Sequence, residues 1–81
     1  MPAENAHATR MARAEITKRL IDSSMLEVRC VGTVCHLTGI LRKLRTHPEV
    51  DLKEEMQHIS HILRSKAGIR EVVWETIIKQ T

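Results

Sequence analysis

Residues 26–41, LEVRCVGTVCHLTGIL, contain the clearest secondary-structure pattern in the chain. Apolar and charged side chains alternate over 26–30, and a period of two is typical of a half-buried strand. The pair Gly32-Thr33 follows, and glycine at the first central position suits a two-residue type II′ turn. A return strand is therefore predicted over 34–41. The inner face of this hairpin is predicted to carry Leu26, Val28, Cys30, Cys35, Leu37 and Leu41.

Helical spacing precedes the hairpin. Ala12, Ile16 and Leu20 lie one helical turn apart, which predicts a helix over 9–21 with these three side chains in the core. Residues 1–8 are small and polar, and we expect them to form a frayed tail. A single domain is then expected to span 9–81.

A second helix is predicted after the hairpin. Two capping boxes compete for its start, Thr46 with Glu49 and Asp51 with Glu54. We expect the start near Pro48, with the amphipathic body of the helix from Leu52. The apolar stripe of this helix consists of Leu52, Met56, Ile59 and Leu63.

Alternation returns over 70–79 and predicts a last strand, whose wet face carries Glu75 and Lys79. The predicted order is helix, strand, strand, helix, strand. The economical arrangement of these elements is an α+β fold with both helices packed on one face of a three-stranded sheet.

The composition limits the functional classes. The chain has 81 residues and a formal net charge of +3, enough for one domain with a marginal core. No secretory signal and no run of about 18 apolar residues is present, so we expect a cytoplasmic protein unless the chain is a fragment of a larger envelope protein. Neither a glycine-rich phosphate loop nor a nucleophile elbow is found. We expect a protein that is not an enzyme and needs no cofactor.

The hairpin also suggests a family. The run GTVCHLTG, residues 32–39, resembles the glycine-bounded V-x-L-x-G hairpin of BON domains. Gly68-Ile69, with Val72 three residues later, resembles the family's G-V-x-x-V entry into the last strand, although Trp74 stands where the family usually has asparagine. The resemblance implies the same α-β-β-α-β order. It also implies binding to phospholipid or other membrane components, or a role as a small assembly module.

A basic segment follows the second predicted strand. Arg42, Lys43, Arg45 and His47 lie within six residues, and such cations attract phosphate groups. The simpler interpretation is a solvated charged loop. Few exposed aromatic side chains are available for base stacking, so we do not expect a nucleic-acid partner.

The two cysteines are predicted to face each other. A two-residue turn places Cys30 opposite Cys35 at a non-hydrogen-bonded site, with Cβ atoms about 5 Å apart. The favoured interpretation is a pair of reduced thiols that fill core space. The alternative is a cross-strand disulfide.

Two further clusters have structural and functional interpretations. Glu54, His58 and His61 share a helix face, which we interpret as solvated rather than as a metal site.

The outer sheet face is predicted to be apolar and uncovered, and therefore a candidate for homodimerisation. Its apolar residues are Val31, Val34, Ile40, Val73 and Ile77.

The leading functional hypothesis is a binding or assembly module that recognises anionic phospholipid headgroups, or another anionic surface, through the segment from Arg42 to His47. The alternative is a self-associating structural or interaction protein that uses the outer sheet face. A small nucleic-acid-binding protein ranks third. The expected partners are an anionic membrane surface, a protein partner, or a second copy of the chain.

Overall fold

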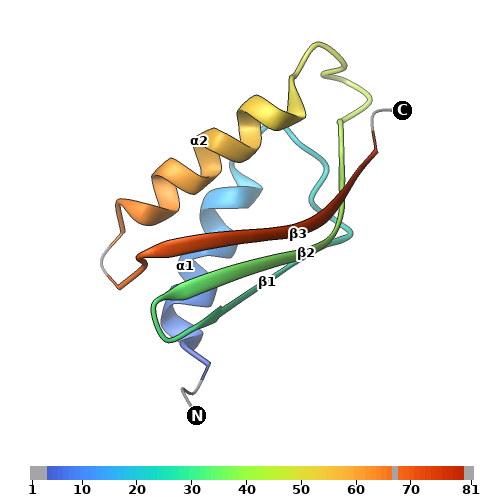
Figure 1. The fold of residues 1–81 in the computed structure, drawn as a ribbon. Helices are drawn as coiled ribbons and strands as arrows, with labels where there is room; N and C mark the ends of the chain where they lie inside the picture. The colour runs from blue at the N-terminus through green and yellow to red at the C-terminus, as the bar shows by residue number, and fades with distance from the viewer. Residues whose placement is uncertain (1–3, 67, 80–81) are drawn as a thin grey trace.

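A computed structural model describes residues 4–66 and 68–79. Helix α1 (Ala6–Thr17) is followed by strands β1 (Leu26–Val31) and β2 (Val34–Arg42), helix α2 (Leu52–Arg64) and strand β3 (Glu71–Lys79). The sheet has the order β1-β2-β3, with β1 antiparallel and β3 parallel to β2. Helix α2 is the crossover between the parallel strands (Figure 1). The predicted α+β fold and its element order are confirmed.

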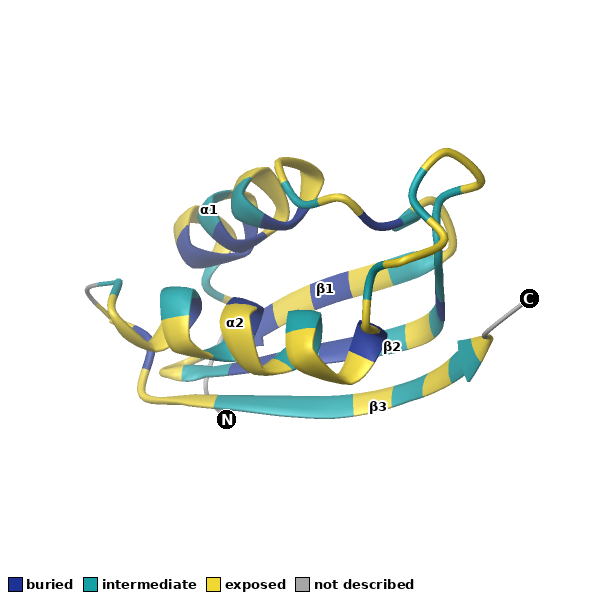
Figure 2. Ribbon diagram, turned by 90° about the horizontal axis from the view of Figure 1, so that it is seen from above, coloured by how far each residue is buried: buried dark blue, intermediate teal, exposed yellow. Residues whose placement is uncertain are grey.

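The molecule has two layers, with both helices on the same face of the sheet (Figure 2). The core lies between the layers and is built from aliphatic side chains and the two cysteines. Inner-face positions of β1 and β2 are buried as predicted, while Leu26 is half-buried. The fully buried large side chains are Ile16, Leu37, Leu41, Leu52, Ile59 and Leu63.

Helix α1 begins and ends earlier than predicted. The side chain of Asn5 caps it by accepting a hydrogen bond from the Ala8 N–H at 3.1 Å, so residues 4–8 belong to the fold rather than to a tail; residues 1–3 lie outside the described residues. The helix ends at Thr17 because the chain must turn to bring the Asp22 N–H to the Arg42 carbonyl, at 2.9 Å. Leu20 therefore lies beyond the helix and is 49% exposed, and its predicted place in the core was wrong.

Two glycines shape the hairpin. Gly32 has φ 61°, whereas Thr33 has a negative φ, because no described non-glycine residue has a positive one. A type II′ turn requires a positive φ at its first central position and a negative φ at its second. Gly39 has φ 105°, and a Cβ atom there would collide with the backbone carbonyl of Met25. Gly39 is therefore required both by its backbone conformation and by the close approach of the neighbouring chain.

Helix α2 starts at Leu52, and its predicted start near Pro48 was wrong. The Asp51 carboxylate accepts hydrogen bonds from the N–H groups of Lys53 and Glu54, at 3.0 and 3.4 Å. Asp51, rather than Thr46, is therefore the N-cap of α2, and turns lie in the segment that precedes it. The predicted stripe is confirmed, with Leu52, Ile59 and Leu63 buried and Met56 packed against the core.

Candidate functional site

The basic segment lies at the end of β2 that is remote from the hairpin turn (Figure 1). A surface hollow of about 500 Å³ opens there. Three of the four predicted basic residues line it, whereas His47 does not. The lining residues are Asp22, Arg42, Lys43, Leu44, Arg45 and Thr46.

Arg42 is held in place by Asp22. Its Nη2 donates to the Asp22 carboxylate at 3.0 Å, beside the backbone bridge between the two residues. The Ser24 hydroxyl and backbone N–H donate to the other carboxylate oxygen at 2.7 and 3.0 Å. These bonds, with the charge of Arg42, hold the pKa of Asp22 below its ordinary value. Asp22 therefore stays ionised and fixes the guanidinium at the hollow.

The other two cations of the hollow keep their charge available. Lys43 Nζ donates to the Pro48 carbonyl at 3.1 Å, and a neutral acceptor orients the ammonium without neutralising it. Arg45 is exposed and has no ion-pair partner within 4–66 and 68–79. The His47 ring bonds to the Thr46 hydroxyl at 3.0 Å, beside the hollow. One carboxylate thus faces three cations.

Exposed apolar side chains gather at the same end of the molecule. In the part of the chain that the structure describes, the exposed large hydrophobic residues are Leu20, Met25 and Ile77, at 49, 51 and 65%. Leu20 and Met25 flank Asp22 in the sequence, and the Met25 carbonyl accepts from the Ile40 N–H at 3.0 Å. Ile77 is the β3 partner of Ile40.

We call this region the loop end: residues 20–25, residues 42–46 and residues 77–79, where Lys79 is the register partner of Arg42. The cations of the loop end were predicted from the sequence, whereas the exposure of Leu20 and Met25 was not. Leu20 fits a helical stripe that the structure ends three residues earlier. Met25 stands directly before the alternating stretch and does not belong to its inner-face pattern. This position was the one sequence signal for its exposure.

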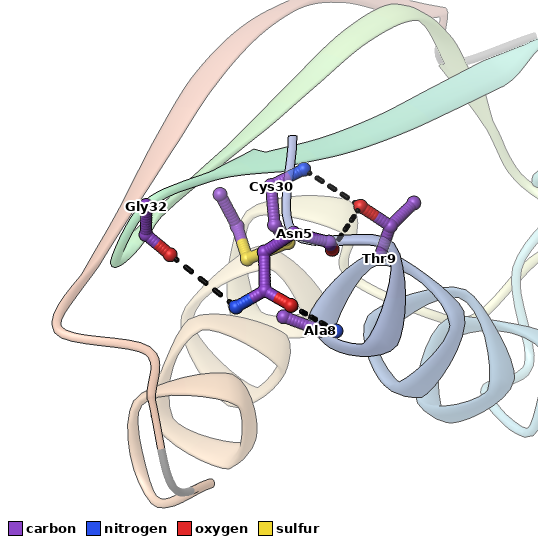
Figure 3. Close-up of a disulfide and its surroundings, with 6 residues drawn as sticks. Asn5, Ala8, Thr9, Cys30 and Gly32 are labelled. Carbon is purple, nitrogen blue, oxygen red and sulfur yellow. Dashed lines mark hydrogen bonds between the residues drawn. A yellow bond between two sulfur atoms is a disulfide. The ribbon is translucent and has the colours of Figure 1, made fainter. Parts of the chain in front are cut away.

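The two cysteines lie opposite each other across the hairpin, so the predicted register of Cys30 with Cys35 is confirmed. In the structure their sulfur atoms are joined in a disulfide rather than held as two thiols. Both residues are fully buried, and Cys30 lies beside the start of α1 (Figure 3). The Cys30 N–H donates to the Thr9 hydroxyl at 3.0 Å, and the Cys30 carbonyl accepts from the Asn5 N–H at 2.7 Å. The disulfide is thus a buried part of the core, not an exposed reactive group.

No described helix covers the outer sheet face (Figure 2). Val34, Ile40 and Val73 are half-buried there by their neighbours, whereas Ile77 is exposed. His36 Nδ1 lies 3.5 Å from Glu75 Oε1 across β2 and β3 on this face. The predicted association face is therefore not covered by a described helix, but its apolar residues alternate with polar and charged ones, among them Thr38, Glu71 and Lys79.

The polar face of α2 carries no metal centre among residues 4–66 and 68–79, because no group of three histidine, cysteine or acidic side chains is close enough to hold an ion. Glu54, His58 and His61 are therefore not brought together as ligands. None of the helices in the described residues is long and apolar enough to cross a bilayer.

Comparisons with protein-family models, with curated proteins and with solved structures found no match. The resemblance to BON domains accordingly rests on the hairpin and the strand entry quoted above.

Proposed function

We propose that this chain is a non-enzymatic module that binds anionic membrane surfaces through its loop end. The observation that carries the proposal is the placement of three cations around one hollow, together with two exposed apolar residues that flank Asp22 of that hollow in the sequence. The cations are Arg42, Lys43 and Arg45, and the apolar side chains are Leu20 and Met25.

The fixed geometry of the cations supports binding to phosphate. Arg42 uses Nη2 for Asp22, which leaves the rest of its guanidinium for another acceptor. Lys43 is oriented by Pro48 and retains two of its three donors. Side chains that are ordered before binding lose less conformational entropy when a ligand arrives. The hollow therefore favours a tetrahedral anion such as a phosphate group.

The apolar neighbours favour a membrane over free phosphate. Each cation near an anionic bilayer contributes about 1 kcal/mol, so two or three alone bind weakly. Burial of an already half-exposed aliphatic side chain among acyl chains contributes a further 0.8–1.5 kcal/mol, roughly half of the value for full burial. Peripheral proteins combine such electrostatic and apolar contributions. A soluble phosphate would gain nothing from Leu20 or Met25.

Co-sedimentation with vesicles tests the proposal. We expect binding to phosphatidylserine-containing vesicles, loss of binding at high salt, and no binding to pure phosphatidylcholine vesicles. Inorganic phosphate at the same charge concentration is expected to compete poorly. Retention of a short single-stranded oligonucleotide in preference to vesicles would instead support the nucleic-acid alternative.

Matched charge reversals locate the site. Lys43→Glu with Arg45→Glu is expected to abolish vesicle binding, since the hollow would then carry three carboxylates. Arg64→Glu with Lys53→Glu makes the same change in net charge on exposed positions of α2, and we expect it to keep most of the binding. Equal losses in both double variants would show a general charge effect and would overturn the assignment of the site.

A further inference from the structure

The two edges of the sheet differ in how they are protected. The edge of β1 is covered near its end by the chain's own N-terminal segment. Glu4 forms a bridge with Val31, and both edge-facing backbone groups of Cys30 are satisfied by Asn5 and Thr9. A covered edge of this kind prevents pairing with another chain.

The edge of β3 has no such cover. No strand or bridge within 4–66 and 68–79 pairs with its outer side, and β3 lies at the periphery of the sheet in Figure 2. Its nine residues contain no proline, and its register with β2 is continuous. Its charged side chains all lie on the outer sheet face, and none points inward to block a partner. β3 therefore lacks the proline, the bulge and the inward-pointing charge that protect many edge strands, although it carries three charged side chains on the outer face.

The free backbone groups of β3 belong to alternate residues. The Glu71 N–H donates to the Thr33 carbonyl, on the side of β2. Strand alternation then directs the backbone groups of the odd-numbered residues toward β2. The groups that point to the free edge are those of Val72, Trp74, Thr76 and Ile78.

We propose that β3 pairs with β3 of a second copy of the chain, antiparallel and two-fold symmetric about Glu75. The strand spans Glu71 to Lys79, so its bounds are symmetric about Glu75 and the whole strand pairs. About eight main-chain hydrogen bonds join the copies, two for each of the four residue pairs that face the edge. The product is a six-stranded sheet with all helices on one face.

This register gives complementary side-chain pairs on the outer face. Glu71 lies opposite Lys79 of the other copy, and the symmetry repeats that ion pair at the other end of the ladder. Val73 lies opposite Ile77, again twice. These are the non-hydrogen-bonded sites, where cross-strand side chains are closest.

Other symmetric registers are worse. A centre on Val73 places Glu71 opposite Glu75, and a centre on Trp74 places Glu75 opposite Val73. A centre on Thr76 places Lys79 opposite Val73. Like charges, or charges opposite apolar side chains, make each of these less favourable. A centre on Ile77 pairs Glu75 with Lys79 but leaves the first part of β3 unpaired.

One like-charge contact remains at the centre, where Glu75 faces its own copy. His36 Nδ1 lies 3.5 Å from that carboxylate within each protomer, and it donates to the carboxylate in the tautomer that has the proton on Nδ1. Glu75 therefore weakens the dimer without preventing it. We expect Glu75→Gln to tighten dimerisation about threefold to tenfold.

A charge swap tests the register in the full-length chain. Glu71→Lys places two lysine pairs across the interface, and we expect the dimer dissociation constant from sedimentation velocity to rise at least about tenfold. Lys79→Glu is expected to have the same effect through two glutamate pairs. The double variant Glu71→Lys, Lys79→Glu restores opposite charges and should restore the dimer. These residues are at opposite ends of one strand, so within a monomer they do not contact each other.

Monomeric wild-type protein at high micromolar concentration would overturn the proposal, and so would a double variant no better than the single ones. A cysteine trap checks the same register independently. Glu75→Cys lies opposite itself and should form a covalent dimer under mild oxidation, whereas Glu71→Cys, on the same strand and face, should not. Equal cross-linking of both variants would indicate random collision and contradict the register. Pairing of β3 is measured by sedimentation velocity without vesicles, so its outcome is independent of membrane binding, and Glu71 and Glu75 lie outside the loop end.

Discussion

The indole Nε1 of Trp74 donates a hydrogen bond to the hydroxyl of Ser60 at 2.6 Å, which ties the edge strand β3 to the middle of α2. Trp74 is half-buried on the inner sheet face, directly beside Leu37 of the central strand. The contact connects the crossover helix to the strand that has only one neighbour in the sheet. Because this is the chain's single tryptophan, its fluorescence reports on the same contact.

Ser60→Ala removes the acceptor and leaves the indole N–H without its partner in a partly buried site. We expect the free energy of unfolding to fall by about 1 kcal/mol, measured by urea denaturation with tryptophan fluorescence. Gln57→Ala, an exposed substitution on the same helix, serves as the control and should change it by less than about 0.5 kcal/mol. Equal stabilities of the two variants would show that the bond contributes nothing.

Reduction of the Cys30–Cys35 disulfide is expected to weaken the fold without abolishing it. The bond closes a short loop, with a sequence separation of 5, so its entropic contribution is about 2 kcal/mol. For a domain of this size, that predicts a fall in Tm of about 10 °C with reductant, measured by circular dichroism. The Cys30→Ala, Cys35→Ala variant should be insensitive to reductant. Two alkylatable thiols in the non-reduced protein under denaturing conditions would contradict the disulfide.

Acid stability should depend on the ion pair between Arg19 and Glu55. Arg19 donates two hydrogen bonds to the Glu55 carboxylate, at 3.0 and 2.6 Å, and these bonds lower the pKa of Glu55 below its ordinary value. A carboxyl whose pKa is lower in the folded state stabilises the protein above its unfolded pKa, and this stabilisation is lost as the pH falls through the folded pKa. Stability should therefore decrease as the pH falls below about 4.3, the ordinary pKa of a glutamate in an unfolded chain.

Glu55→Gln removes that titration and should flatten this part of the stability curve. Near neutral pH the substitution is expected to destabilise the protein by about 1 kcal/mol. Partial burial strengthens the ion pair, whereas the remaining contact with solvent screens it and keeps the loss small. Glu49→Gln provides an exposed control outside any observed ion pair. The prediction fails if both variants show the acid dependence of the wild type.

Two glycine-to-alanine substitutions separate the cost of a strained backbone conformation from the cost of a steric clash. Gly39 and Gly68 both have a positive φ, at 105° and 91°, so alanine is strained at either position. An added Cβ meets nothing within 4 Å at Gly68 but collides with the Met25 backbone at Gly39. We expect Gly68→Ala to destabilise the protein by about 1 kcal/mol and Gly39→Ala by about 3 kcal/mol or more. Equal destabilisation by the two substitutions, measured by thermal denaturation, would show that the Met25 backbone moves away from the added Cβ without cost.

The features predicted from sequence are those whose signals are local. The turn at Gly32-Thr33 and the period of two fix the hairpin register, which is why the opposition of Cys30 and Cys35 could be derived. Leu20 was misplaced because helix periodicity carries no information about the backbone bridge of Asp22 to Arg42, which ends α1 early. The start of α2 was misplaced because two adjacent capping boxes are equivalent until the geometry selects Asp51.

The candidate site shows the same division. A run of cations is visible in the sequence, but its convergence on a hollow depends on Asp22, which is 20 residues away from Arg42. The free edge of β3 depends on strand order, which the sequence left open. Tertiary placement therefore determined the parts that pattern reasoning missed.

The two proposals together predict vesicle clustering. Antiparallel pairing of β3 places the two loop ends of a dimer at opposite ends of the joined sheet, separated by at least about 30 Å, the length of a nine-residue strand. One flat membrane then contacts only one loop end, and the other is free to bind a second vesicle. Wild-type protein should increase the turbidity of anionic vesicles. Val73→Asp, which puts a carboxylate opposite Ile77 of the other copy, should bind vesicles as a folded monomer without clustering them. If this variant is monomeric by sedimentation velocity and still clusters vesicles, the dimer is not the bridging species; if it neither binds nor clusters although it is folded, the membrane contact includes the sheet face.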